Sequence, residues 1–315
     1  MKNRVYGIIG ISSIMSNWNA DFTGRPKSTS NGDIFGSDKA LKYSIKKYWL
    51  NNGEKVIYIK SYKIDDKGKV EEKNKIQPKT LEERYMEVFN TKLEEKTPSK
   101  EVLGNLFTAI DIMNFGATFA VAKQNISITG VVQIGQGYNK FEDTNVEVQD
   151  ILSPFKNPKK EEADASSLGK KIISDEAHYM YHFSVNPQNY DEYKDIIDGF
   201  TGYTKEAYEK FKEGALVGAT ALNTNSKVGC ENEFALFIEC KENSELYLSN
   251  LDKYVSFEKG EDKNIINLTK LDFINQDKIM DQVDNIEIYY NPITTEVVEH
   301  FSKVNKFNIF TKEEI

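Results

Sequence analysis

The chain has 315 residues, of which 39% are apolar and 12% aromatic, so it is long enough to bury a substantial hydrophobic core. Two cysteines exclude a disulfide framework, and no stretch approaches the ~20 apolar residues of a membrane helix. Residues 5–15 follow Lys2 and Arg4 as a signal peptide would, but glycine and serine interrupt the run and favour a buried strand. We therefore expect a cytoplasmic globular protein with no membrane partner.

The charge of the chain is distributed unevenly. Its formal net charge is −8, which argues against phosphate binding because nucleic-acid affinity depends on clustered lysine and arginine. Residues 1–60, however, carry a net charge of +6, so the other 255 residues carry −14. A chain of this kind can present one basic surface while its acidic remainder keeps it in solution. Charge alone favours an ordinary acidic protein whose lysines happen to cluster.

Residues 5–15 predict the first strand, and residues 16–36 form a polar loop of a length that is usually functional or disordered. Ser37 then caps a helix that extends to about Leu50. Apolar residues share one face of this helix and lysines another: Leu41, Ile45, Tyr48 and Trp49 against Lys39, Lys42 and Lys46. The apolar face belongs to the core, and the lysine face is either solvated or an edge of a phosphate track.

The next segments predict short strands and helices. Residues 55–62 alternate as in a strand, and residues 80–89 and 99–113 have helical patterns. Residues 115–123 and 126–136 are expected to pair as two strands, because their apolar residues and threonines fit a buried sheet.

Residues 150–176 differ in composition from the rest of the chain. They are rich in Pro, Lys, Glu, Asp, Ser and Gly and include Pro154, Pro158 and the Lys159-Lys160 pair. Such a segment buries little apolar surface. It is either a disordered surface insertion or an arm that reaches out of the domain toward a partner.

The later elements complete a recognisable order. Residues 178–185 alternate, residues 204–216 predict an amphipathic helix, and residues 233–240 predict a strongly apolar strand. The core order is therefore strand, helix, strand, strand, helix, strand, which is the split βαβ order of ferredoxin-like and RNA-recognition folds. A strand at residues 285–290 and a helix at residues 294–303 are expected to complete the sheet.

Motifs for catalysis or metal binding are not recognisable. His178 and His182 lie on an alternating segment, where the rise of a strand separates them by about 13 Å, too far to share an ion. Cys230 and Cys240 lie at the two ends of a strand and lack the spacing of a zinc knuckle. The chain has neither a phosphate-binding glycine-rich loop nor a nucleophile elbow. We expect no cofactor, no metal and no catalytic residue.

Five groups of segments occur in one order along the chain. They are 16–22 (SNWNADF) with 24–26 (GRP) and 36–43 (GSDKALKY), 109–111 (AID) with 115–117 (FGA), 128–133 (ITGVVQ), 185–187 (VNP), and 222–229 (LNTNSKVG). Together they resemble the backbone subunit of type I CRISPR Cascade complexes, of the RAMP superfamily, and most closely the I-B subtype. Met113, Asn225 and residues 136–140 depart from the family, which usually has arginine there. Guide contacts at those places are either lost or supplied by neighbours such as Lys227 and Lys140.

The resemblance implies an α+β subunit shaped like a right hand. It implies one RNA-recognition-like (ferredoxin-like) domain over residues 1–315 as palm, with helical finger insertions at about 63–113 and a protruding thumb at about 150–176. Copies of the subunit would stack helically along one guide RNA (crRNA), beside other Cascade subunits. Each thumb would kink the guide and flip out one nucleotide, leaving the rest to pair with target DNA in antiviral defence.

A subunit that accepts any guide sequence should hold phosphates and sugar hydroxyls and leave base edges free. The candidate RNA-binding residues are Ser16, Asn17, Asn19, Arg25, Lys27, Lys39, Lys42, Lys46, Gln133, Asn223, Ser226 and Lys227. The candidate thumb residues are Lys156, Lys159 and Lys160. Base stacking is a secondary expectation, because the aromatic pairs of an ordinary RNA-recognition surface are not recognisable as a motif.

Two alternatives stay open. In the first, the chain is an RNA-cleaving backbone subunit like those of type III complexes, in which Asp21 or Asp33 activates a ribose 2′-hydroxyl or holds a metal ion. Loop-shaping roles for both aspartates are favoured over this one. In the second, the chain is a small-molecule enzyme or a stand-alone binding protein, which the absence of any cofactor motif disfavours.

Overall fold

The computed structural model describes residues 1–65, 75–152 and 168–315. Its centre is a sheet in which four antiparallel strands lie in the order β10, β1, β9, β7. These strands are β1 (Val5–Ser16), β7 (Val132–Asn139), β9 (Leu168–Val185) and β10 (Cys230–Cys240). One long helix follows β1 and another follows β9, so the chain has the ferredoxin-like element order. The predicted α+β fold class is confirmed.

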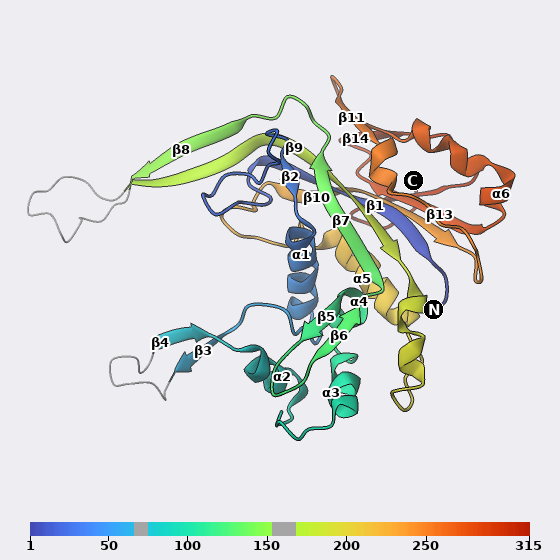
Figure 1. Ribbon diagram of the computed structural model, residues 1–315. Helices are drawn as coiled ribbons and strands as arrows, with labels where there is room; N and C mark the ends of the chain where they lie inside the picture. The colour runs from blue at the N-terminus through green and yellow to red at the C-terminus, as the bar shows by residue number, and fades with distance from the viewer. Residues whose placement is uncertain (66–74, 153–167) are drawn as a thin grey trace, which may run out of the picture.

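Two helices cover one face of this sheet (Figure 1). They are α1 (Asp38–Asn51) and α5 (Lys205–Val217), which pack against each other. The predicted apolar face of α1 is buried at Leu41, Ile45 and Trp49. The side chain of Thr204 caps α5, whereas Ser37 precedes α1 without a side-chain cap bond. Both predicted helices are confirmed.

A group of short elements lies between α1 and β7 along the chain. It consists of α2 (Leu81–Phe89), α3 (Ser99–Leu106), α4 (Ile110–Phe115), β5 (Gly116–Phe119) and β6 (Ile126–Thr129). The side chains of the residue before α2 and of Glu83 form a capping box, which confirms the helix predicted at 80–89. β5 and β6 pair as an antiparallel hairpin, as their sequence predicted.

The prediction of a strand at residues 55–62 is wrong, because only Tyr62 of these residues belongs to a strand. The carboxylate of Asp111 accepts hydrogen bonds from the backbone N–H groups of Ile57 at 3.0 Å and Tyr58 at 2.8 Å. These donors are therefore satisfied by a side chain instead of a neighbouring strand. The apolar residues that suggested a strand, Val56 and Ile57, are buried in the core without one.

Two predicted elements are each divided. The helix expected at residues 99–113 ends at Leu106, and α4 begins at Ile110 after a turn. The strand expected at residues 126–136 is β6 followed by β7, with Gly130 between them. The backbone of Phe115 lies so close to Gly130 that any Cβ there would overlap it. A glycine is therefore required where the chain leaves the small hairpin for the central sheet.

Two hairpins extend to the same side of the molecule, with α1 between their bases (Figure 1). The finger hairpin is formed by β3 (Tyr62–Asp65) and β4 (Lys75–Pro78). The thumb hairpin is formed by β8 (Val146–Leu152) and the first part of β9. The structure thus shows paired strands at residues 150–152 and 168–176, at either end of the segment that composition set apart.

The C-terminal segment covers the opposite face of the central sheet. β13 (Val283–Tyr290) and β15 (Asn305–Asn308) extend the sheet beyond β10. A separate three-stranded sheet is formed by β11 (Ser256–Lys259), β12 (Asn264–Asn267) and β14 (Thr295–Val298). Apolar side chains from this segment pack on those of β1, β9 and β10. The sheet surface that RNA-recognition domains use for base stacking is therefore largely buried here.

The prediction of a helix at residues 294–303 is wrong, because residues 295–298 form the strand β14. Val297 is buried and its strand pairs in parallel with β12, so tertiary pairing overrides the local helical pattern. The only α-helix described after α5 is α6 (Asp277–Met280), a single turn.

The described helices are short. The longest, α1, has 14 residues, which corresponds to about 21 Å of helix. None of the helices in residues 1–65, 75–152 and 168–315 is long and apolar enough to cross a membrane.

Candidate nucleic-acid interface

The end of β1 is held by a small buried cluster of hydroxyl and thiol groups. Ser16 Oγ lies 2.8 Å from Ser13 Oγ and 3.1 Å from Cys230 Sγ, and the Ser174 hydroxyl donates to the Ser16 carbonyl oxygen at 3.0 Å. Ser16 is 1% exposed. This side chain therefore positions the start of the loop at residues 17–34 and is not open to a ligand.

Asn17 and Lys227 join that loop to the segment before β10. The Asn17 side-chain amide donates to the carbonyl oxygens of Gly24 and Ile172, both at 3.0 Å. The Lys227 ammonium donates to the Asn17 carbonyl oxygen at 2.6 Å and lies 5.9 Å from the Trp18 ring centroid. Burial lowers the pKa of Lys227. The two predicted ligands are thus brought together, but their polar groups stabilise the loop.

Trp18 and Asn19 fix the loop to the start of α1. Trp18 Nε1 donates to the hydroxyl of Tyr181 in β9 at 2.5 Å, and that hydroxyl donates to the Ser37 carbonyl oxygen at 3.4 Å. Asn19 Oδ1 accepts from the Ser37 backbone N–H at 2.8 Å. Gly36 lies directly beside the Trp18 and Tyr181 side chains, where a Cβ would overlap both. The loop and α1 are therefore held as one unit.

Asp21 and Asp33 shape turns within the loop. Asp21 Oδ1 accepts from the Thr23 backbone N–H at 2.7 Å, the Thr23 hydroxyl at 2.8 Å and the Arg25 N–H at 3.0 Å. The hydrogen bonds from Thr23 lower the pKa of the Asp21 carboxyl, more than its slight burial raises it. Asp33 accepts from the Thr29 hydroxyl at 3.4 Å. Both line an open cavity of about 670 Å³, which Tyr138 also lines.

The basic side chains differ in how free they are. Arg25 and Lys39 are exposed and make no ion pair within the described residues. Lys42, in contrast, is paired with Asp38 at 3.1 Å, and Lys46 donates to the Tyr58 carbonyl oxygen at 2.6 Å. Burial lowers the pKa of Lys46. Lys39 and Arg25 are therefore the cations most available to phosphate.

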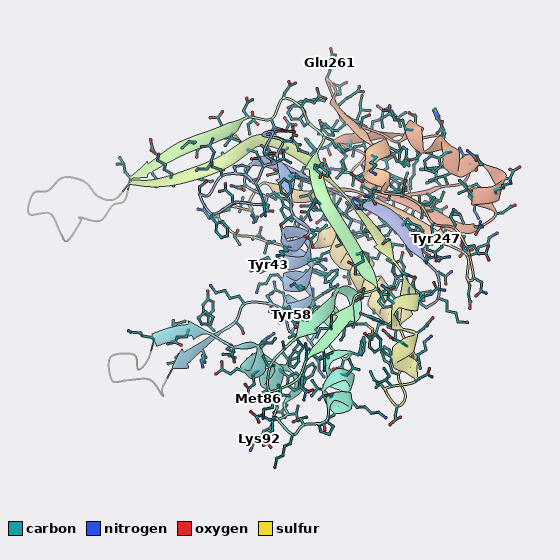
Figure 2. The ribbon with its side chains drawn as sticks, viewed as in Figure 1. Tyr43, Tyr58, Met86, Lys92, Tyr247 and Glu261 are labelled. Carbon is teal, nitrogen blue, oxygen red and sulfur yellow. The ribbon has the colours of Figure 1, made fainter. Side chains whose placement is uncertain are left out.

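Tyr43 is a further candidate RNA contact that was not among the residues predicted from the sequence. It lies between Lys39 and Lys47 at helical spacing, and its side chain is 44% exposed. Figure 2 shows Tyr43 on the side of α1 toward which the finger and thumb hairpins extend. An exposed aromatic ring between lysines suits a nucleic-acid strand, because bases stack on such rings. The spacing of residues 39, 43 and 47 could have revealed it.

The other candidates lie elsewhere. Asn223 and Ser226 are exposed in the segment before β10, and the Ser226 carbonyl oxygen accepts from the Asn17 N–H at 2.9 Å. Lys27 belongs to the first loop itself, and its ammonium lies 5.7 Å from the Phe35 ring centroid. Gln133 is opposite Ser184, which in turn is opposite Tyr6 at the start of β1, so Gln133 lies at the far end of the sheet. Lys156, Lys159 and Lys160 lie outside the described residues.

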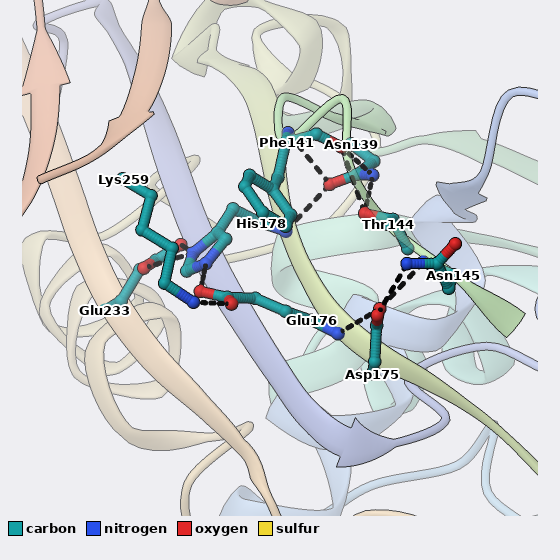
Figure 3. A network of polar contacts seen from close by, with 9 residues as sticks. All are labelled: Asn139, Phe141, Thr144, Asn145, Asp175, Glu176, His178, Glu233 and Lys259. Carbon is teal, nitrogen blue, oxygen red and sulfur yellow. Dashed lines mark hydrogen bonds and ion pairs between the residues drawn. The ribbon is translucent and has the colours of Figure 1, made fainter. Parts of the chain in front are cut away.

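A buried polar network holds the root of the thumb hairpin (Figure 3). His178 contacts Glu233 at 2.8 Å and Glu176 at 3.2 Å, and its ring stacks on Phe257 of β11 with the centroids 3.7 Å apart. Glu176 is also paired with Lys259. Burial by itself lowers the pKa of His178, but the two carboxylates outweigh it and the pKa is raised. The imidazole thus ties β9 to β10 and to the C-terminal sheet.

The two histidines of β9 have different partners. His182 lies 3.0 Å from Asp252, whereas His178 contacts the glutamates of the network in Figure 3. Within the described residues no three His, Cys, Asp or Glu side chains are grouped in a way that could hold a metal ion. Cys230 and Cys240 are both buried as free thiols at the two ends of β10.

Comparison with known families agrees with this geometry. The family model described as CRISPR-associated protein Cas7 matches residues 3–281. The chain belongs to this family. The resemblance to CRISPR backbone subunits is thereby confirmed. No curated protein matches the sequence.

One solved structure shares the fold along almost the whole chain, and two others are similar at lower scores. A chain of a structure titled "CRISPR RNA-guided surveillance complex, pre-nicking" has a TM-score of 0.54 at 12% identity, covering 95% of this chain and 96% of that one. A second, "CRISPR RNA-guided surveillance complex", has a TM-score of 0.48 at 12% identity over 94% and 95%. A chain of a type III-B Cmr-beta complex bound to cognate target RNA has a TM-score of 0.38 at 10% identity over 73% and 59%. The first of these shows that the chain shares its fold with a chain of an RNA-guided surveillance complex.

Proposed function

We propose that this chain is the repeated backbone subunit of a type I CRISPR interference complex. It oligomerises along a guide RNA, holds the phosphate backbone and presents the bases for pairing with target DNA. Membership of the Cas7 family and a fold shared with a chain of an RNA-guided surveillance complex support this function. In this proposal the chain functions in the cytoplasm, where it assembles with other subunits of the complex.

The observation that carries the proposal is the rigid basic surface made by the loop and α1. Asn19 is bonded to Ser37, the residue before α1, and Trp18 is linked to it through Tyr181, so the loop and the helix present Arg25 and Lys39 from one unit. Tyr43 lies on the same helix as Lys39, one turn further along. Exposed cations with an aromatic ring hold a strand through its phosphates and base faces, independent of sequence.

We also propose that the chain is not a catalyst. The Oδ1 atom of Asp21 already accepts three hydrogen bonds from its own turn, and Asp33 accepts one from Thr29. Turn-shaping explains both aspartates, whereas cleavage as in type III complexes needs a carboxylate free to contact the ribose or a metal ion. Metal-dependent cutting of a guide-complementary RNA, abolished by Asp21→Ala, would contradict this proposal.

The first experiment is co-expression of the chain with a CRISPR array. The purified material should absorb as a protein–RNA complex, have the mass of several subunits, and yield repeat-flanked guides on sequencing. A matched preparation without the array controls for adventitious cellular RNA. An RNA-free monomer in the presence of the array would reduce the family relationship to fold alone.

A further inference from the structure

Arg4 is a buried cation without a carboxylate partner. Its residue is only 7% exposed, and its guanidinium donates to the Ser244 carbonyl oxygen. No acidic side chain pairs with Arg4 in the part of the chain that the structure describes. Enclosing an unpaired charge is costly, and a guanidinium has five N–H donors to satisfy. The site is therefore suited to an anion.

Two cavities meet at Arg4. One, of about 190 Å³, is lined by Arg4, Gln188, Asp191, Lys194, Lys241 and Ser244 among others. The other, of about 270 Å³, is lined by Arg4, Tyr6, His182, Ser184, Asn186 and Tyr247 among others. Asn186 Oδ1 is buried without a hydrogen-bond partner in the structure. The second cavity therefore offers a buried acceptor as well as the guanidinium.

The charges around the first cavity are mostly positive. Lys2 is paired with Glu242 at 2.8 Å, and Lys194 with Asp191 at 2.5 Å. Lys241 is exposed and makes no ion pair within residues 1–65, 75–152 and 168–315, so two cations, Arg4 and Lys241, have no carboxylate of their own. This local excess is notable in a chain whose net charge is −8. Phosphate is the oxyanion that such a fork of donors and a nearby ammonium bind well.

Tyr247 adds an aromatic surface beside the cation. The Arg4 guanidinium carbon lies 4.1 Å from the Tyr247 ring centroid, and the Tyr247 side chain is 71% exposed. One face of the ring is therefore covered by Arg4 and the other is available for stacking. We propose that the Arg4 cavities form a second nucleotide site, with a phosphate at Arg4 and Lys241 and a base on Tyr247. The nucleotide is either free in solution or one unit of a single strand.

This site is separate from the surface formed by the loop and α1. Arg4 precedes the 12-residue strand β1 and Ser16 ends it, so the two ends are about 40 Å apart. Figure 2 shows Tyr247 well apart from Tyr43, to the right of the central helix α1. The inference does not depend on the proposed function, because it rests on Arg4 and its surroundings alone.

The test is calorimetric titration of the full chain with AMP, inorganic phosphate and a short single-stranded RNA. Titrations with the RNA use an Arg25→Glu, Lys39→Glu background, which silences the other surface. Lys241→Gln is expected to weaken AMP binding about 3- to 10-fold, the net effect of one hydrogen bond at an exposed position. Tyr247→Ala is expected to weaken AMP and leave inorganic phosphate unchanged. Lys303→Gln removes an exposed lysine elsewhere and controls for net charge.

The outcomes separate the two sources. AMP binding that responds to Lys241→Gln and Tyr247→Ala but not to Lys303→Gln supports a free nucleotide. If AMP does not bind, but the RNA binds and its affinity is lowered by Lys241→Gln and Tyr247→Ala and not by Lys303→Gln, the site takes a nucleotide within a strand. Absence of binding for every probe, or equal binding by all the variants, would overturn the site. Both variants alter exposed side chains, so loss of folding does not obscure the result.

Discussion

Charge reversal at the loop and α1 should change how RNA binding depends on salt. Arg25→Glu with Lys39→Glu removes two exposed cations that lack an ion pair in the described residues. Each phosphate contact with a single strand contributes about 0.7 to the slope of log affinity against log salt, so losing two lowers the slope by about 1.4. Between about 50 and 200 mM salt the wild type should therefore lose about 7-fold more affinity than the variant.

Fluorescence anisotropy of a labelled single-stranded RNA, titrated at several salt concentrations, measures this slope. Lys278→Glu with Lys303→Glu is the matched control, because it makes the same change in net charge with exposed lysines of the C-terminal segment. The control should keep the wild-type slope. Equal slopes for all three proteins would refute the assignment of the phosphate track to the loop and α1, whatever the absolute affinities.

Three further predictions concern single side chains. Tyr43→Ala should weaken RNA binding by about 1–3 kcal/mol in the same anisotropy assay, whereas Tyr43→Phe should retain it, since stacking needs only the ring. The pKa of His178 in the folded state is raised above its ordinary value of 6.5. Its ion pairs with the two glutamates therefore stabilise the fold fully below about pH 6.5, and this stabilisation is lost as the pH rises through the raised pKa. Urea unfolding at pH values between about 5 and 8 should show this decline, and His178→Gln should flatten it; an identical pH profile would argue against the carboxylate pairing. Gly36→Ala should lower the free energy of unfolding by about 1–3 kcal/mol, because the new methyl group would overlap Trp18 and Tyr181; unchanged thermal melting would contradict that packing.

Helices with local signals were predictable from the sequence. Thr80 with Glu83 forms the capping box of α2, and Thr204 caps α5, so each start is encoded within a few residues. The mostly apolar residues 5–15 likewise predicted a buried first strand, and the structure places that strand between β10 and β9. The family resemblance could also be recognised from the sequence, because it depends on short segments that occur in a fixed order along the chain and not on how distant residues pack.

Contacts between distant residues were decided only by the tertiary structure. The Asp111 carboxylate accepts the backbone hydrogen bonds of residues 57 and 58, and residues 295–298 pair with β12 as a strand. The strand predicted at 55–62 and the helix predicted at 294–303 were therefore both wrong. Ser16 and Asn17 were predicted to contact RNA, but in the structure their side chains hold the first loop in place. Whether a polar side chain binds a ligand or its own fold depends on which groups the folded chain brings within hydrogen-bond distance, and that is not written in local sequence.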